Sequence, residues 1–185
     1  MNEQIFFNLY SLAHQSCFLD KIIILFAEYL PYLLVFWVLV YAFKNDFGKF
    51  DFKNPFKIVK KRFSFIFNMF FPALAGWVIV SFLKGVVSYP RPFVLYQEIV
   101  RPLFVHGGMD SFPSGHAAFF GALALSAFLV DKKMGYWVLL ASILIGVGRI
   151  ISGVHFPIDI LIGYLIGLLV VLLFYLFSNI RHLKK

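Results

Sequence analysis

Polar residues gather in three short stretches of a chain that is otherwise strongly apolar. Their types suit the binding and cleavage of an anion, because they combine cations, a helix start and two imidazoles. The stretches contain Lys84 and Arg91–Pro92, then Pro113–Ser114–Gly115–His116, and then Arg149, His155 and Asp159. Ionisable groups are costly at membrane depth, so each of them needs a partner or a task.

The third stretch places a carboxylate where it can orient an imidazole. His155 and Asp159 are four residues apart, and Pro157 between them is typical of the first turn of a helix. This spacing lets Asp159 meet one ring nitrogen of His155, which fixes the tautomer and leaves the other nitrogen free as a nucleophile. The competing interpretation is a structural His–Asp pair at a membrane boundary.

The other two stretches complete an anion site. Lys84, Arg91 and Arg149 supply three cations, and the start of a helix at Ser114 and Gly115 supplies backbone N–H groups. His116 follows and can act as the proton donor. Phosphoryl transfer mostly needs this combination of positioning and charge stabilisation. Taken singly, Lys84 and Arg91 could instead be boundary residues that reach lipid headgroups, and the second stretch a helix cap with His116 as an interfacial residue.

A metal site is the alternative for the two histidines and the aspartate. His116, His155 and Asp159 are all possible ligands, but three fixed cations nearby oppose the binding of a divalent ion. We therefore expect no metal, and no other cofactor.

The composition places these stretches in a membrane protein. Hydrophobic residues make up 61% of the 185 residues, and the mean hydropathy is +0.85, whereas globular domains are roughly half apolar. A membrane-spanning helix needs about 20 mainly apolar residues. Five stretches reach or approach this length: Lys21–Phe43, Ser64–Leu83, Gly115–Val130, Tyr136–Gly153 and Pro157–Phe177. The predicted fold class is an all-α polytopic membrane helix bundle with five spans, or six if residues 1–18 also cross.

The sequence predicts a short N-terminal segment followed by a single domain. His14 and its polar neighbours interrupt the apolar patch near the start, so residues 1–20 are expected to form an N-terminal interfacial segment. This opening lacks the basic region of a cleavable signal peptide, so the first apolar segment is expected to be retained as an anchor. Residues 21–185 form a single membrane domain, with the polar stretches within 84–159. Gly163-x3-Gly167 could be a dimer face or a site of close packing within the bundle, and the oligomeric state stays open.

The distribution of Lys and Arg orients the predicted bundle, because cytoplasmic loops are enriched in both. With five spans, one side receives Lys44, Lys49, Lys53, Lys57, Lys60, Lys61, Arg62, Lys132, Lys133, Arg181, Lys184 and Lys185, and the other receives Lys21, Lys84, Arg91, Arg101 and Arg149. The first side is predicted to be cytoplasmic, so all three polar stretches face outward. The net charge of +8 is accounted for in this way, and no nucleic-acid motif accompanies it.

Read together, the three stretches resemble the signature motifs of the type 2 phosphatidic acid phosphatase superfamily. Lys84-x6-Arg91-Pro92, Pro113-Ser114-Gly115-His116 and Arg149-x5-His155-x3-Asp159 occur in the family's order. The resemblance implies that His155 forms a phosphohistidine and that Asp159 orients it. It also implies that His116 protonates the leaving oxygen and later activates water. The implied phosphate-binding groups are Lys84, Arg91, Ser114, Gly115 and Arg149, and the family works without metal.

One position departs from the family pattern. The third motif usually begins Ser-Arg, and here it begins Gly148-Arg149, so one hydroxyl is missing. The loss puts a hydrogen bond of about 1 kcal/mol in doubt.

Within the superfamily, the small size and the opening residues are similar to bacterial undecaprenyl pyrophosphate phosphatases of the bacitracin-resistance type. This resemblance implies hydrolysis of undecaprenyl pyrophosphate to undecaprenyl phosphate at the outer face of the cytoplasmic membrane, during peptidoglycan synthesis. The expected partners are a polyprenyl or phospholipid phosphate substrate and membrane lipids, with no nucleic acid. Alternative substrates are phosphatidylglycerol phosphate, phosphatidate and the phosphate of lipid A, and a non-enzymatic anion transporter is the alternative class.

Overall fold

The computed structural model describes residues 1–43, 55–104 and 108–178, with the side chains of residues 55–61 excepted. In this part of the chain the regular structure is helical, apart from an isolated bridge between Pro90 and Asp110. The elements are α1 (Asn2–Tyr10), α2 (Cys17–Ile24), the π-helical turn η1 (Leu25–Tyr29), α3 (Leu30–Phe43), α4 (Pro55–Val87), α5 (Pro92–Leu95), α6 (Gly115–Val130), α7 (Lys132–Ile151) and α8 (Pro157–Phe177).

Each predicted span corresponds to a described apolar helix, and three of the five have shifted ends. Four described helices are long and apolar enough to cross a membrane: Cys17–Phe43, Arg62–Val87, Lys132–Ile151 and Pro157–Phe177. The fifth, α6, is a shorter apolar helix. The first span begins four residues before the predicted Lys21, because Ser16 caps α2 by accepting a hydrogen bond from the backbone of Leu19. Helix α1 has nine residues and is about 14 Å long, too short to cross a bilayer, so the described helices form a bundle of five.

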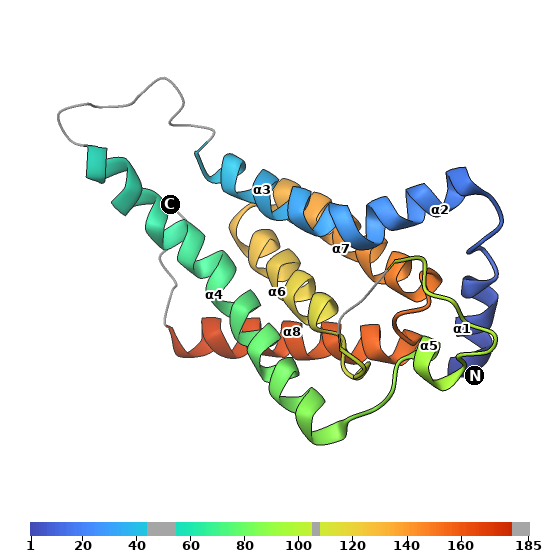
Figure 1. Cartoon of the computed structure of the whole chain (residues 1–185). Coiled ribbons are helices and arrows are strands. Elements are labelled where there is room, and N and C mark those ends of the chain that lie inside the picture. The colour runs from blue at the N-terminus through green and yellow to red at the C-terminus, as the bar shows by residue number, and fades with distance from the viewer. Residues whose placement is uncertain (44–54, 105–107, 179–185) are drawn as a thin grey trace.

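Helix α6 lies at the centre of this bundle, between α4, α7 and α8 (Figure 1). Small residues let α8 approach it until the backbones touch. A Cβ at Gly163 would lie 2.6 Å from the carbonyl oxygen of Ser114, and one at Gly167 would overlap the carbonyl oxygen of Ala118. Gly163 and Gly167 therefore serve close packing within the bundle, one of the two roles open to them from the sequence.

The two ends of the bundle differ in what they hold. Figure 1 shows α1 and α5 at the same end as the start of α8. At the opposite end, the Tyr41 hydroxyl near the end of α3 bonds to Asp131 between α6 and α7. Among the cations used to predict the orientation, Lys44, Lys49, Lys53, Arg181, Lys184 and Lys185 lie outside the described residues, as do the side chains of Lys57, Lys60 and Lys61.

Candidate active site

The three polar stretches meet at the end of the bundle that holds the start of α8. The backbone N–H of Ser114 donates to the carbonyl oxygen of Asp159 at 3.0 Å, which joins the second stretch to the third. Arg91 Nη1 donates to the carbonyl oxygen of Val154 at 2.9 Å, which joins the first stretch to the third. The predicted convergence is therefore present in the fold.

His155 and Asp159 form the expected pair at the turn between α7 and α8. The distance from His155 Nδ1 to Asp159 Oδ2 is 3.4 Å, and both side chains are buried. Asp159 is fixed in turn, because the same oxygen accepts from the backbone N–H of Phe156 at 2.7 Å and so caps the first turn of α8. The carboxylate thus faces one ring nitrogen only, and Nε2 is directed toward the cations.

Burial and positive charge keep the His155 ring neutral. Burial lowers the pKa of His155 well below its ordinary value of 6.5, and the charges of Arg149, Arg91, Lys84 and His116 lower it further. A neutral imidazole retains the lone pair that a nucleophile needs. The carboxylate of Asp159 can then offset the positive charge that the ring acquires once Nε2 has formed a bond.

Arg91 lies against Nε2 of His155. Its Nη1 is 3.4 Å from His155 Nε2, and its Nε donates to the carbonyl oxygen of Gly108 at 3.0 Å. Only 3% of Arg91 is exposed, so this cation does not extend to lipid headgroups. Burial lowers the pKa of Arg91 to about 10, which leaves the guanidinium charged at neutral pH. A phosphoryl group in front of Nε2 would lie directly beside it.

Lys84 reaches the same region from the last turn of α4. Its Nζ donates to the carbonyl oxygens of Asp110 at 2.8 Å and Ser111 at 3.3 Å. These contacts hold the loop before the Pro113–His116 stretch and fix the direction of the ammonium. Lys84 therefore both shapes the site and adds charge to it.

Arg149 is the third cation of the site. It is held by the first span, a contact that the sequence did not predict. Its Nη1 donates to the carbonyl oxygen of Ala27 at 3.1 Å, and 1% of the residue is exposed. In an α-helix the carbonyl of Ala27 would accept from residue 31, but that residue is Pro31, which has no N–H. The π-helical turn at Leu25–Tyr29 lies at this point, and such turns often mark functional sites.

The Pro113–His116 stretch forms the start of α6, as predicted. Ser114 is the N-cap, fully buried, and its hydroxyl accepts from the backbone N–H of Ala117. Gly115 begins the helix beside the Trp77 ring, to which a Cβ would approach within 3.1 Å. The first N–H groups of a helix attract anions, so this end of α6 adds partial positive charge where the cations already lie.

His116 borders an apolar groove of about 300 Å³ between α3, α4 and α6. The groove is lined by Pro31, Tyr32, Val35, Leu74, Trp77, Gly115, His116, Phe119 and Phe120. The second histidine therefore lies between the polar site and a hydrocarbon-like surface. Among the described residues, no cluster of three or more His, Cys, Asp or Glu side chains could hold a metal ion.

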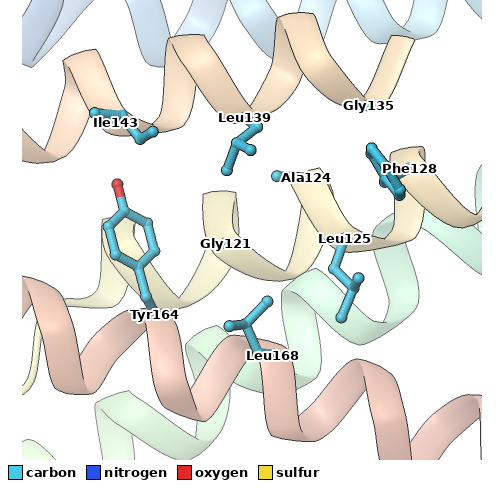
Figure 2. A pocket seen from close by; sticks show the side chains of 9 residues that line it. All are labelled: Gly121, Ala124, Leu125, Phe128, Gly135, Leu139, Ile143, Tyr164 and Leu168. Atoms are coloured by element: carbon cyan, nitrogen blue, oxygen red, sulfur yellow. The ribbon is translucent and has the colours of Figure 1, made fainter. Parts of the chain in front are cut away.

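A larger cavity, of about 420 Å³, lies elsewhere in the bundle (Figure 2). It is lined by residues of α6, α7 and α8, among them Phe128, Leu139 and Leu168. Figure 2 shows the Tyr164 hydroxyl pointing from α8 toward α7, where it donates to the carbonyl oxygen of Ser142. None of the residues of the three polar stretches lines this cavity.

Ser111 is a site residue that the sequence did not indicate. It is fully buried, and its hydroxyl donates to Asp159 Oδ2 and lies 3.3 Å from His155 Nδ1. Its only signal is its position two residues before Pro113. A serine in an irregular loop belongs to no periodic pattern, so spacing could not have identified it.

The comparisons with known proteins agree with this geometry. A sequence profile described as the PAP2 superfamily matches residues 64–182, which include all three stretches. The chain is 29% identical to "Undecaprenyl-diphosphatase BcrC" of Bacillus subtilis, over 97% of this chain and 86% of that protein. It is 27% identical to "Bacitracin transport permease protein BcrC" of Bacillus licheniformis, over 85% of this chain and 71% of that protein.

A solved structure has the same fold. The crystal structure of Aquifex aeolicus LpxE matches with a TM-score of 0.70 and 26% identity, and covers 93% of each chain. The profile alone spans more than half of the sequence. Together with the apolar helices, these matches lead to one conclusion: the chain belongs to the PAP2 superfamily and is a multi-pass membrane lipid phosphatase.

Proposed function

We propose that this phosphatase hydrolyses undecaprenyl diphosphate to undecaprenyl phosphate and inorganic phosphate at the outer face of the cytoplasmic membrane. The observation that carries this proposal is the apolar groove that borders His116 beside the cations and His155. A headgroup bound at the cations would leave its hydrocarbon chain in this groove. The relative of Bacillus subtilis, matched over most of both chains, is named for this substrate.

In the proposed first step, His155 Nε2 attacks the terminal phosphorus. A P–N bond forms while the P–O bond to the leaving lipid phosphate breaks, and the electron pair stays on the leaving oxygen. The imidazolium of His116 gives this oxygen a proton. Lys84, Arg91 and Arg149 bind the phosphoryl oxygens, where charge must be stabilised.

The second step returns the enzyme to its starting state. Neutral His116 takes a proton from water, and the water oxygen attacks phosphorus. The P–N bond breaks, its electron pair returns to Nε2, and inorganic phosphate leaves. Asp159 offsets the positive charge of the phosphorylated ring between the two steps, and neither step uses a metal.

The direct test is phosphate release from undecaprenyl diphosphate by the purified protein in lipid nanodiscs. We expect activity that a chelator does not reduce, and a loss of at least about 10³-fold in His155→Ala, because the nucleophile is removed. Retention of most of the activity by His155→Ala would refute the assigned nucleophile, and inactivation by the chelator would refute the metal-free mechanism.

The proposed place of the lipid chain can be tested by narrowing the groove. In Val35→Trp, we expect KM for undecaprenyl diphosphate to rise about tenfold, while KM for farnesyl diphosphate changes little, since the short chain needs less of the groove. Leu172→Trp is the matched control, because Leu172 is exposed on α8 away from the groove. Equal effects on both substrates would refute the proposal that the lipid chain lies in the groove.

Other lipid phosphates are the first competing substrates. Phosphatidylglycerol phosphate, phosphatidate and lipid A carry the same reactive group, and an apolar groove accepts acyl and prenyl chains alike. Side-by-side kcat/KM values for these lipids and undecaprenyl diphosphate would decide between them. A higher value for any diacyl lipid would overturn the proposed substrate and leave the proposed chemistry intact.

Transport is the second candidate, because the relative of Bacillus licheniformis is named as a transport permease. An anion transporter would need the cations but no nucleophile. Uptake of bacitracin or phosphate into proteoliposomes by His155→Ala, at the rate of the unmodified protein, would favour transport over hydrolysis.

A further inference from the structure

The Ser111 hydroxyl lies between the two groups that prepare the nucleophile. It donates to Asp159 Oδ2 and lies 3.3 Å from His155 Nδ1, whereas the direct distance from Nδ1 to Oδ2 is 3.4 Å. All three side chains are buried. The imidazole is therefore at least as close to the hydroxyl as to the carboxylate.

The hydrogen-bonding capacity of a hydroxyl decides the direction of these contacts. A serine has one hydrogen to donate and two lone pairs to accept with. Once the hydrogen of Ser111 is given to Asp159, its oxygen can only accept from His155, so Nδ1 must carry a proton. This arrangement leaves the lone pair on Nε2, the nitrogen that faces Arg91.

We propose that Ser111 is a positioning residue for His155: its hydroxyl accepts a hydrogen bond from Nδ1–H, donates to Asp159, and so holds the imidazole in the nucleophilic tautomer together with the carboxylate. The inference depends on the proposed function, because it needs His155 as the nucleophile.

The backbone of Ser111 links the same site to the first polar stretch. Its carbonyl oxygen accepts from Lys84 Nζ at 3.3 Å, and its N–H donates to the carbonyl oxygen of Tyr89 at 2.7 Å. Substitution of the side chain leaves both backbone contacts possible. The hydroxyl can therefore be removed while the loop keeps its anchors, and its contribution can be measured separately.

The test compares three serine variants on the substrate hydrolysed by the unmodified protein. In Ser111→Ala, we expect kcat to fall about 10- to 100-fold, the range observed when hydrogen-bond partners that orient metal-bound histidines are removed, with KM within about twofold. Ser111→Thr keeps the hydroxyl, so we expect kcat within about threefold of the unmodified value. Ser126→Ala is the control, because Ser126 is fully buried in α6 and belongs to none of the polar stretches, so its activity should be unchanged.

A second measurement reports the protonation of the His155 ring directly. The ¹⁵N chemical shifts of the histidine rings, assigned by comparison with His155→Ala, report which nitrogen carries the proton. We expect the Nδ1–H form of His155 in the unmodified protein and a smaller fraction of it in Ser111→Ala. A proton on Nε2 in the unmodified protein would overturn the inference.

The kinetic outcomes separate this inference from the proposed function. If His155→Ala is inactive but Ser111→Ala has an unchanged kcat, the role of Ser111 is refuted and the nucleophile stands. If Ser111→Thr is as impaired as Ser111→Ala, the serine has only a packing role and the inference also fails. If His155→Ala remains active, the proposed function itself fails.

Discussion

The positive charges around His155 set the pH range in which this residue can act. Burial and four neighbouring charged groups lower its pKa well below 6.5, so the ring stays neutral, and nucleophilic, into acidic solution. In the proposed mechanism, the cations that bind phosphate thus also keep the nucleophile deprotonated. The two roles can be separated by removing one charge.

Arg149→Gln tests this coupling. Loss of the positive charge raises the pKa of His155, so the ring becomes protonated at a higher pH. We expect the acid limb of the kcat/KM profile to move to higher pH, and the maximum to fall about 10²- to 10³-fold because a phosphate ligand is lost. Arg101 is an exposed arginine at the same end of the molecule. In Arg101→Gln, the pH of the acid limb should therefore be unchanged. An acid limb that moves to lower pH would contradict the coupling.

Gly148, the departure from the family pattern, is explained by the neighbouring helix. A Cβ at this position would lie 3.1 Å from the backbone nitrogen of Ala27 and 3.3 Å from its Cα. A side chain at this position would thus require the neighbouring helix, whose carbonyl holds Arg149, to move by a few tenths of an ångström.

We therefore expect Gly148→Ser to impair the protein, although it restores the usual family residue. Overpacking of this kind costs about 1–3 kcal/mol, and a displaced Ala27 would weaken its bond to Arg149. Thermal unfolding in detergent should show a lower midpoint, and kcat should fall. Gly85→Ser is the control, since a Cβ at Gly85 meets nothing within 4 Å. If Gly148→Ser were as stable and active as the unmodified protein, the segment around Ala27 would move aside with little loss of stability, and the prediction would be wrong.

Among individual residues, the sequence predicted the charged side chains of the site well, but not the backbone groups that hold them in place. Lys84, Arg91, His155 and Asp159 could be recognised because ionisable groups are rare and costly in apolar helices. The carbonyl of Ala27 could not be recognised, because every residue has a carbonyl and only the fold selects one. Pro31 was the available signal, since a proline within a helix always leaves one carbonyl without its helical donor.

Among the helices, α1 has the least expected position, because it packs against the turn that holds His155. Phe6 is fully buried, with its ring centroid 5.2 Å from that of Phe156, the residue after His155. The side chain of Asn2 accepts from the backbone N–H of Ile158 at 3.1 Å, in the first turn of α8. Contact of α1 with the bilayer surface stays a prediction, but its contact with the site is direct.

Removing these contacts should reduce activity without touching any group that binds phosphate. Phe6→Ala should destabilise the protein by about 3–5 kcal/mol, the usual cost for a buried Phe, and Asn2→Ala by about 0.5–2 kcal/mol, the cost of a lost cap. We expect kcat to follow the same order, as measured by phosphate release below the unfolding temperature. Ile5→Ala, on the exposed side of α1, is the control. If Phe6→Ala had normal kcat, α1 would not support the site.

The long helices were predictable because about 20 apolar residues in a row have few other structures available. Gly115–Val130 and Pro157–Phe177 begin and end as predicted, since Ser114 and Pro157 are strong helix-start signals. Helix α4 begins earlier than the predicted Ser64, because helical structure can continue beyond the apolar part of a segment. The docking of α1 was not predictable, since a nine-residue helix has no length or periodicity that identifies its partner.

For the molecule as a whole, one end holds the site and the other holds Lys132 and Lys133. Cys17, the only cysteine in the sequence, is exposed at the start of α2. It follows His14, which bonds to the backbone of Arg101 in the loop before the site. The native cysteine is therefore a natural probe for the compartment that the site faces.

If the site faces outward, a membrane-impermeant maleimide should label Cys17 in intact cells. The matched variant Cys17→Ser/Lys133→Cys carries its thiol at the opposite end, where residue 133 is exposed, and should react only after the membrane is permeabilised. The reverse pattern would place the site in the cytoplasm. Labelling of both proteins in intact cells would indicate a leaky preparation, which a cytoplasmic marker protein would reveal.

The contact between the α6 and α8 backbones also limits the conformational changes that the enzyme can make. Ser114 and Asp159 are joined through their main chains, and Gly163 and Gly167 leave no side chain to slide between these two helices. Separating α6 from α8 to widen the site would break this backbone contact, which aligns the second polar stretch with the third. The apolar groove that borders His116 lies between α3, α4 and α6, so a lipid chain can occupy it while α6 and α8 stay in contact. Because Lys84 lies on α4 and Arg149 bonds to Ala27 in the first span, a large movement of the first two spans would also displace these cations.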